Sequence, residues 1–229
     1  MKAVILAGGF GKRLRPLTDS KPKPLIEVAG KPILTWQIEW LKRYGVNEIV
    51  LCVGYLKEKI IEHVGGGNRH GLKAGYVVEE EPLGKGGALK NAEAFLKGEE
   101  KFLVLNGDII TNLNPMRLME EVDNFVGAIA LVPLKSPFGI VDVDDKGFAR
   151  RFREKPLIPE YWVNAGIYGF TPRIFGYLPG KGEIEDTTFP KLSEEGKLKA
   201  LKYEDVFWSP IDTHKDIEET EKVLRSHKN

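Results

Sequence analysis

Apolar runs alternate with amphipathic stretches along the first half of the chain. Four short apolar runs predict buried strands, over Lys2–Leu6, Glu48–Val53, Ala74–Val78 and Phe102–Leu105. Three stretches with helical spacing separate them: one opened by Pro32 with Gly45 as its C-cap, one over Lys57–Val64, and one over Gly87–Leu96 with Leu89, Ala92 and Phe95 on one face. Such alternation predicts parallel strands joined by right-handed helical crossovers.

The pattern changes after residue 126. Further strands are predicted over Val126–Val132, Ile140–Val143, Phe148–Arg153, Gly166–Phe170 and Leu198–Tyr203, and a closing helix over Lys215–Arg225. No linker rich in Ser and Gly interrupts the chain, so we expect one domain over residues 1–229. The predicted fold is α/β and Rossmann-like: a mostly parallel mixed sheet flanked by helices, with extra strands that extend the sheet and form one wall of the site.

Composition and charge narrow the classes of partner. The chain has 34 basic and 33 acidic residues, which argues against a nucleic-acid stripe or a polybasic membrane patch. Its apolar runs are too short for a signal peptide or a membrane span, so a cytoplasmic protein is expected. Cys52 is the only cysteine, which excludes an intramolecular disulfide and a thiolate metal cluster. Any anionic partner must therefore be held by a local site.

A glycine-rich segment follows the first predicted strand. Residues 7–25 read AGGFGKRLRPLTDSKPKPL, with three glycines and five cations. Glycines let a backbone approach a phosphate closely, and the cations suit a triphosphate. The spacing fits neither a dinucleotide fingerprint nor a P-loop, because Leu14 stands where a third glycine is needed and Arg13 follows Lys12. Judged alone, the segment is also compatible with a flexible loop of solvated charges.

The order of residues in this segment is more specific. The runs Arg13-Leu14-Arg15-Pro16-Leu17-Thr18, Pro22-Lys23-Pro24-Leu25 and Gly30-Lys31-Pro32-Ile33-Leu34 together resemble the signature of the sugar-phosphate nucleotidylyltransferases. Lys12 departs from the Thr that many members carry, and it keeps a donor while adding charge. Motifs of the same family recur in the expected order over nearly the whole chain.

The resemblance implies which residues hold the nucleotide. The nucleotide-binding residues would be Leu6, Ala7, Gly8, Gly9, Gly11, Lys12, Arg13, Glu81 and Gly86. The last two belong to Glu81-Pro82-Leu83-Gly84-Lys85-Gly86-Gly87, which resembles the base-recognition segment, although a simple turn and helix start would look alike. Arg13, Lys23 and Asp108 would be catalytic, with Lys23 bridging the α-phosphate and the incoming phosphate.

Other motifs resemble the sugar side and the metal site. Gly139, Glu154, Lys155 and Asn164 would hold the sugar phosphate, although Glu154 and Lys155 also fit a surface ion pair. Asp108 and Asp212 would bind Mg²⁺. Pro210 occupies the place, two residues after Trp208, where most members carry the second metal-binding Asp. Asp212 is expected to take that role, with helix capping as its alternative.

The activity implied is attack of a sugar 1-phosphate on the α-phosphate of an NTP, which gives an NDP-sugar and pyrophosphate. Two alternatives stay open: a cytidylyltransferase of the same fold that acts on inositol phosphate or phosphocholine, and a non-catalytic regulatory subunit that binds a sugar nucleotide. The resemblance is to a short form without a C-terminal β-helix. The sequence leaves the base, the sugar and a homo-oligomeric state undecided.

Overall fold

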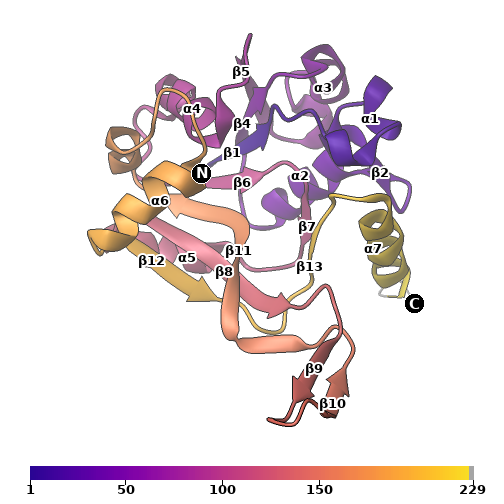
Figure 1. Ribbon diagram of the computed structural model, residues 1–229. Helices are drawn as coiled ribbons and strands as arrows, with labels where there is room; N and C mark the ends of the chain where they lie inside the picture. Colours follow the sequence, from indigo (N-terminus) through magenta and orange to yellow (C-terminus); the bar gives the residue numbers. More distant parts are fainter. Residues whose placement is uncertain (227–229) are drawn as a thin grey trace.

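A seven-stranded sheet with helices on both faces forms the body of the protein (Figure 1). The computed structural model describes residues 1–226. The strand order is β12-β8-β11-β6-β1-β4-β5. The bounds are β1 (Lys2–Ala7), β4 (Glu48–Val53), β5 (Lys73–Val78), β6 (Phe102–Asn106), β8 (Gly127–Lys135), β11 (Leu157–Phe170) and β12 (Leu198–Lys202).

Strand directions confirm a mostly parallel mixed sheet. β1 runs parallel to β4 and β6, β4 runs parallel to β5, and β12 runs parallel to β8. β11 is the exception, since it lies antiparallel between β6 and β8. The carboxyl ends of β6, β1, β4 and β5 therefore meet at one edge of the sheet, where open α/β sheets bind ligands.

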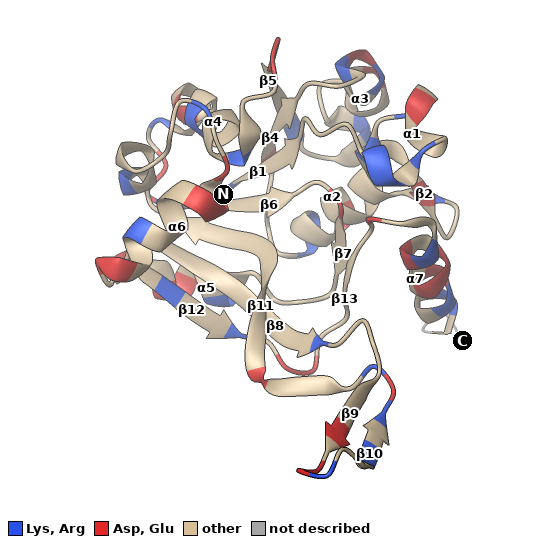
Figure 2. Cartoon of the chain, viewed as in Figure 1, with Lys and Arg blue, Asp and Glu red and all other residues tan. Residues whose placement is uncertain are grey.

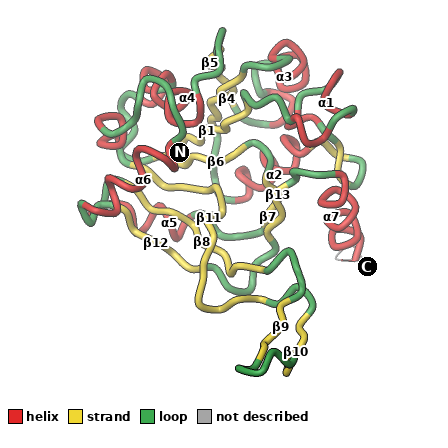
Figure 3. Tube along the Cα trace, viewed as in Figure 1, coloured by secondary structure: helices red, strands yellow, loops and turns green. Residues whose placement is uncertain are grey.

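Both faces of this sheet are buried, which explains its continuous apolar strands. In β1, Ala3 and Ile5 join a core with α2 (Ile33–Arg43), α3 (Lys57–Val64) and α5 (Met116–Glu121). Val4 points to the other face and packs with α4 (Gly84–Asn91) and α6 (Ile184–Glu194). Figure 3 shows the strands in the middle with helices on either side.

Short elements and the 13-residue helix α7 complete the chain. They are η1 (Lys12–Leu14), α1 (Leu17–Ser20), η2 (Lys23–Leu25), β2 (Glu27–Val28), β3 (Lys31–Pro32), η3 (Asn68–His70), η4 (Glu93–Leu96), β7 (Ile109–Thr111), η5 (Val122–Asn124), η6 (Pro172–Gly176), β13 (Trp208–Pro210) and α7 (His214–Ser226). A third core joins Leu14, Ile110 and Ile211 and packs against α7, so it ties the last segment to the glycine-rich one. No helix within residues 1–226 is both long and apolar enough to cross a membrane.

The prediction that all the later strands extend the sheet was wrong for two of them. β9 (Ile140–Val143) and β10 (Ala149–Arg153) form a separate two-stranded sheet that projects at the bottom of Figure 1. β8, β11 and β12 do extend the main sheet. Three arginines in the five residues of β10 leave too few apolar side chains to cover a buried face.

The helix predicted over Gly87–Leu96 also differs. α4 begins at Gly84 and ends at Asn91, and η4 follows it. Within this helix, Gly86 packs closely on a neighbouring segment, because a Cβ there would lie 2.8 Å from Pro179 Cδ. Phe95 is 43% exposed, so it does not share the buried face of Leu89 and Ala92.

Candidate active site

A cavity of about 330 Å³ opens at the edge where the parallel strands end. Most of its lining comes from the ends of β1 and β6 and from the residues that directly follow β1, β5 and β6. Residues of α4 also line it. It is lined by Leu6, Ala7, Gly8, Gly9, Phe10, Lys23, Pro24, Glu79, Pro82, Gly84, Lys85, Ala88, Asn106, Gly107, Asp108 and Glu183. The predicted residues Leu6, Ala7, Gly8, Gly9, Lys23 and Asp108 are among them.

The turn after the cavity-lining glycines requires Gly11. Its φ of 62° is left-handed, and its carbonyl accepts a hydrogen bond of 2.9 Å from Thr18 Oγ1. A Cβ there would lie 2.9 Å from Thr18 Cγ2 and 3.1 Å from Lys23 Cβ. Gly11 therefore lets the segment fold back so that Lys23 returns to the cavity.

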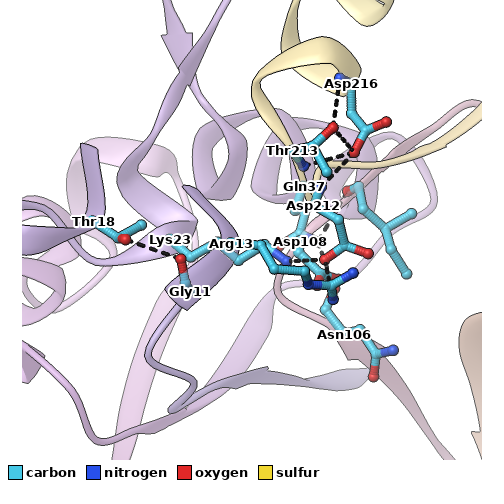
Figure 4. Close-up of polar contacts among 11 residues, drawn as sticks. Gly11, Arg13, Thr18, Lys23, Gln37, Asn106, Asp108, Asp212, Thr213 and Asp216 are labelled. Atoms are coloured by element: carbon cyan, nitrogen blue, oxygen red, sulfur yellow. Dashed lines mark hydrogen bonds and ion pairs between the residues drawn. The ribbon is translucent and has the colours of Figure 1, made fainter. Parts of the chain in front are cut away.

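Lys23 lies between the two predicted metal-binding carboxylates (Figure 4). Its Nζ is 2.6 Å from Asp108 Oδ2 and 2.7 Å from Asp212 Oδ1. The Lys23 side chain is only 13% exposed, so these contacts are poorly screened by solvent. Arg13 adds a second cation, since its Nη2 donates to Asp212 Oδ1 over 2.8 Å while its side chain is 70% exposed.

Two three-residue strands bring Asp108 and Asp212 together. β13 pairs antiparallel with β7, which places Pro210 opposite Ile109. Beyond that pair, Ile211 N donates to Asp108 O over 2.8 Å. Asp212 follows directly and reaches Lys23. Pro210, which departs from the family pattern, thus serves as a strand residue next to the site.

The capping role that competed for Asp212 is taken by its neighbours. Thr213 N and Asp212 N donate to Asp216 Oδ2 over 2.7 and 3.0 Å, and Asp216 N donates to Thr213 Oγ1 over 3.3 Å. This reciprocal pair is a capping box at the start of α7. The Asp212 carboxylate is therefore left to face Lys23 and Arg13 (Figure 4).

The donor set at this point fits Mg²⁺. Residues 1–226 contain no group of three or more His, Cys, Asp or Glu arranged for a metal. Mg²⁺ is commonly held by one or two carboxylates together with substrate phosphates. Asp108 Oδ1 and Asp212 Oδ2 accept no hydrogen bond from the described part of the protein, so each carboxylate keeps an oxygen for a cation.

The predicted base-binding residues Glu81 and Gly86 both contact the segment 179–182. Glu81 is exposed, lines a smaller neighbouring cavity of about 180 Å³, and pairs with Lys181 at 3.5 Å. Gly86 packs beneath the 179–182 segment and donates from its N–H to Gly182 O over 2.9 Å. Neither lines the larger cavity. Glu79 lines both cavities, and sequence reasoning missed it, although its place directly after a predicted strand was a usable signal.

The predicted sugar-side residues lie outside the larger cavity as well. Asn164 in β11 donates from Nδ2 to the Tyr168 hydroxyl over 2.9 Å and accepts from Gly166 N over 2.8 Å. A Cβ at Gly139 would lie 3.1 Å from Glu154 Oε2, so these two residues pack together. Lys155 has a left-handed φ of 43°, and contact with the Lys215 ammonium lowers its pKa.

One predicted nucleotide-binding residue lies on the outer side of the glycine turn. Lys12 Nζ is 5.7 Å from the centroid of the Phe10 ring. Such a contact suits an exposed cation that stays available to solvent or to an anionic ligand.

Known proteins resemble this chain over nearly its whole length. The family model described as Nucleotidyl transferase matches residues 2–227. The chain belongs to the nucleotidyl transferase family. Among curated relatives, it is 37% identical to the "Bifunctional protein GlmU" of Methanococcus maripaludis, over 95% of this chain and 53% of that protein. It is also 37% identical to the "Mannose-1-phosphate guanylyltransferase catalytic subunit beta" of Danio rerio, over 95% of this chain and 62% of that protein.

A solved structure of this nucleotidyl transferase fold spans the same length. The structure of HddC from Yersinia pseudotuberculosis complexed with GMP-PN superposes with a TM-score of 0.77 and 28% identity, and covers 97% of this chain and 99% of that one. The chain thus spans between half and two thirds of the length of the two curated relatives, and nearly all of the solved one.

Proposed function

We propose that the chain is a Mg²⁺-dependent sugar-1-phosphate nucleotidylyltransferase, and that residues 1–229 act as one catalytic domain. The observation that carries the proposal is the Lys23 ammonium held between Asp108 and Asp212, at 2.6 and 2.7 Å, beside the glycine-lined cavity. Cations and carboxylates placed this way suit phosphoryl chemistry, where positioning and charge stabilisation carry most of the catalysis.

In this reaction, an oxygen of the sugar phosphate attacks the α-phosphorus of an NTP in line, and pyrophosphate leaves. A phosphate monoester has a second pKa of about 6, so the nucleophile is already anionic at neutral pH and no general base is required. Lys23 would hold the α-phosphate against the incoming phosphate. Arg13 and the backbone of Gly8–Gly11 would hold the β- and γ-phosphates.

Asp108 and Asp212 would hold Mg²⁺ through the oxygens that they keep free. When bound, the ion would neutralise charge on the phosphates around the reacting phosphorus. The sugar-phosphate residues would be Gly139, Glu154, Lys155 and Asn164, with Lys155 on the phosphate. Arrival of an anion between Lys155 and Lys215 would relieve the repulsion that lowers the pKa of Lys155.

The relatives support a sugar phosphate rather than another phosphate as the acceptor. One is named a mannose-1-phosphate guanylyltransferase, and it shares 37% of its residues with this chain over the matched region. The test is pyrophosphate release with Mg²⁺, crossing ATP, GTP, CTP, UTP and dTTP with glucose, mannose and inositol phosphates and with phosphocholine. Release that requires a sugar 1-phosphate is expected.

Two outcomes would overturn the proposal. Release only with inositol phosphate or phosphocholine would identify an acceptor of another class. No release with any pair, together with retained binding of a sugar nucleotide, would indicate a regulatory subunit.

A further inference from the structure

Glu79 lies at one end of the larger cavity. It follows β5, donates from its N–H to Val53 O over 2.8 Å, and accepts from Leu83 N over 3.4 Å. A Cβ at Gly8 would lie 3.3 Å from Glu79 Oε2, so the carboxylate packs against the glycine loop. The side chain is thus fixed between the loop after β1 and the start of α4.

The neighbouring acidic residues are paired with lysines, whereas Glu79 is not. Glu80 pairs with Lys57 at 3.2 Å, Glu81 with Lys181 at 3.5 Å, and Glu183 with Lys85 at 3.8 Å. Within residues 1–226, no cation forms an ion pair with Glu79. Leu83 N at 3.4 Å is the one donor that the described residues give this partly buried carboxylate, and burial raises the pKa of Glu79. The group is therefore suited to receive hydrogen bonds from a ligand.

Glu79 and the proposed phosphate end follow different strands of the sheet. Asp108, which Lys23 contacts, lies after β6, and Glu79 lies after β5, with β1 and β4 between these two strands. Three strand spacings of about 4.8 Å separate the ends of β5 and β6, about 14 Å in all, and the Glu79 side chain reaches part of the way back, to the loop after β1. Leu6, Pro82 and Ala88 give the same cavity an apolar part of its wall. A nucleoside with its phosphates at Lys23 would lie across this wall with its base edge toward Glu79.

The chemistry of a carboxylate then selects among the bases. An ionised carboxylate only accepts hydrogen bonds, through two oxygens. Guanine presents two adjacent donors, N1–H and the N2 amino group. Adenine and cytosine present one amino group beside an acceptor nitrogen, and uracil and thymine present one N–H between two carbonyls. Guanine is thus the base whose edge matches both carboxylate oxygens.

We propose that Glu79 is the residue that selects guanine, so that GTP is the nucleotide substrate. The inference rests on the proposed nucleotidylyltransferase function and names the base for that site. It also assigns the base contact to Glu79 in place of Glu81, which faces the smaller cavity and pairs with Lys181.

The test compares three isosteric variants, E79Q, E81Q and E80Q, across the NTPs with the sugar 1-phosphate that the wild type uses. We expect the wild type to have its highest kcat/KM with GTP. In E79Q, kcat/KM for GTP should fall about 10- to 100-fold, mostly through KM, because an amide clashes with one of the two guanine donors. E80Q is the matched control, since the Glu80 side chain is 84% exposed and pairs with Lys57.

Folding of E79Q is checked separately by thermal denaturation. The raised pKa of Glu79 means that the folded protein disfavours its ionised form, so at neutral pH the neutral amide should leave the melting temperature unchanged or higher. The amide that replaces the carboxylate would keep an oxygen to accept from Leu83 N. A loss of activity with GTP in E79Q then reports on the base contact.

Three results would overturn the inference. A wild type that prefers UTP, dTTP, CTP or ATP would refute guanine selection while leaving the proposed function intact. A change of base preference in E81Q but not in E79Q would return the contact to Glu81. If no NTP supports pyrophosphate release, the affinities of the wild type for GDP, UDP, CDP and ADP are measured by calorimetry instead. Equal affinity for all four would contradict guanine selection.

Discussion

The region around Asp108 and Asp212 and the β9–β10 hairpin differ in how many contacts hold their side chains in place. Lys23, Asp108 and Asp212 contact one another directly, and Gln37 Nε2 donates to Asn106 O and Ile109 O, which fixes the loop that carries Asp108. In the hairpin region, Phe138, Phe148 and Phe152 are between 62% and 75% exposed. Charges of both signs lie on its surface (Figure 2).

This difference in packing leads us to expect different contributions from the two proposed halves of the site. The charged groups proposed for phosphate chemistry contact one another directly, and charges held in place in this way lower a reaction barrier without reorganisation. Glu154 and Lys155 lie beside the hairpin, at the connection between β10 and β11. We expect the first region to govern kcat and the second to govern binding of the acceptor.

The largest effect is expected from Asp108→Asn. The change removes one of the two carboxylates proposed for Mg²⁺ and the charge that contacts Lys23 at 2.6 Å. Activity should fall at least about 1,000-fold at ordinary Mg²⁺, since charge stabilisation at phosphorus is lost. Pyrophosphate release measured over a Mg²⁺ titration checks this.

Asp145→Asn, in the exposed turn of the hairpin, is the matched control for this change. It removes one carboxylate of the same kind and should leave kcat unchanged. Unaltered activity of Asp108→Asn would remove Asp108 from the proposed metal site.

A somewhat smaller loss is expected from Arg13→Ala. If Arg13 holds the leaving phosphates, its loss should raise the activation free energy by about 2.7–4 kcal/mol, as for a lost transition-state donor. The value of kcat should then fall about 10²–10³-fold. The melting temperature should change little, because the Arg13 side chain of this pair is 70% exposed. Single-turnover kinetics measure the chemical step, and thermal denaturation measures stability. Arg225→Ala on α7 is the control for both. A near-normal kcat in Arg13→Ala would show that Arg13 only pairs with Asp212.

The central sheet could be predicted from the sequence because its strands are buried on both faces. β1 and β4 therefore read as continuous apolar runs, and glycine marks where β1 ends. The hairpin has no such signal, since neighbouring structure rather than local pattern decides whether a short alternating strand joins a sheet. That is why the prediction for β9 and β10 was wrong.

The site could be predicted only in part, for a related reason. The family signature indicated Lys23, Asp108 and Asp212, but β7 and β13, which bring the two carboxylates together, are three residues long and give no periodicity. Glu79 was missed because it lies one residue outside the predicted strand Ala74–Val78 and in a run of three glutamates. Which of those three faces the cavity depends on the register of β5 beside β4, which is a tertiary feature.

On the acceptor side, Lys155→Ala tests whether the second region governs binding. The loss of one charged hydrogen bond to the sugar phosphate should raise its KM about 10- to 100-fold, since such bonds contribute about 1.5–3 kcal/mol. KM for the NTP should stay within about twofold. Lys146→Ala in the hairpin turn is the control, and an equal rise in both KM values would contradict a separate acceptor region.

The smallest effect is expected from Phe152→Ser. This change tests whether the exposed phenylalanines of the hairpin region face solvent or are covered by another molecule. Phe152 is 67% exposed, so its removal should change the free energy of unfolding by no more than about 0.5 kcal/mol. Phe102→Ala, in the fully buried ring stack with Phe175, should cost about 3–5 kcal/mol and calibrates the measurement. Both are read from urea denaturation at two protein concentrations. A loss above about 2 kcal/mol for Phe152→Ser that grows with protein concentration would mean that a second copy covers this face, because only association makes stability depend on concentration.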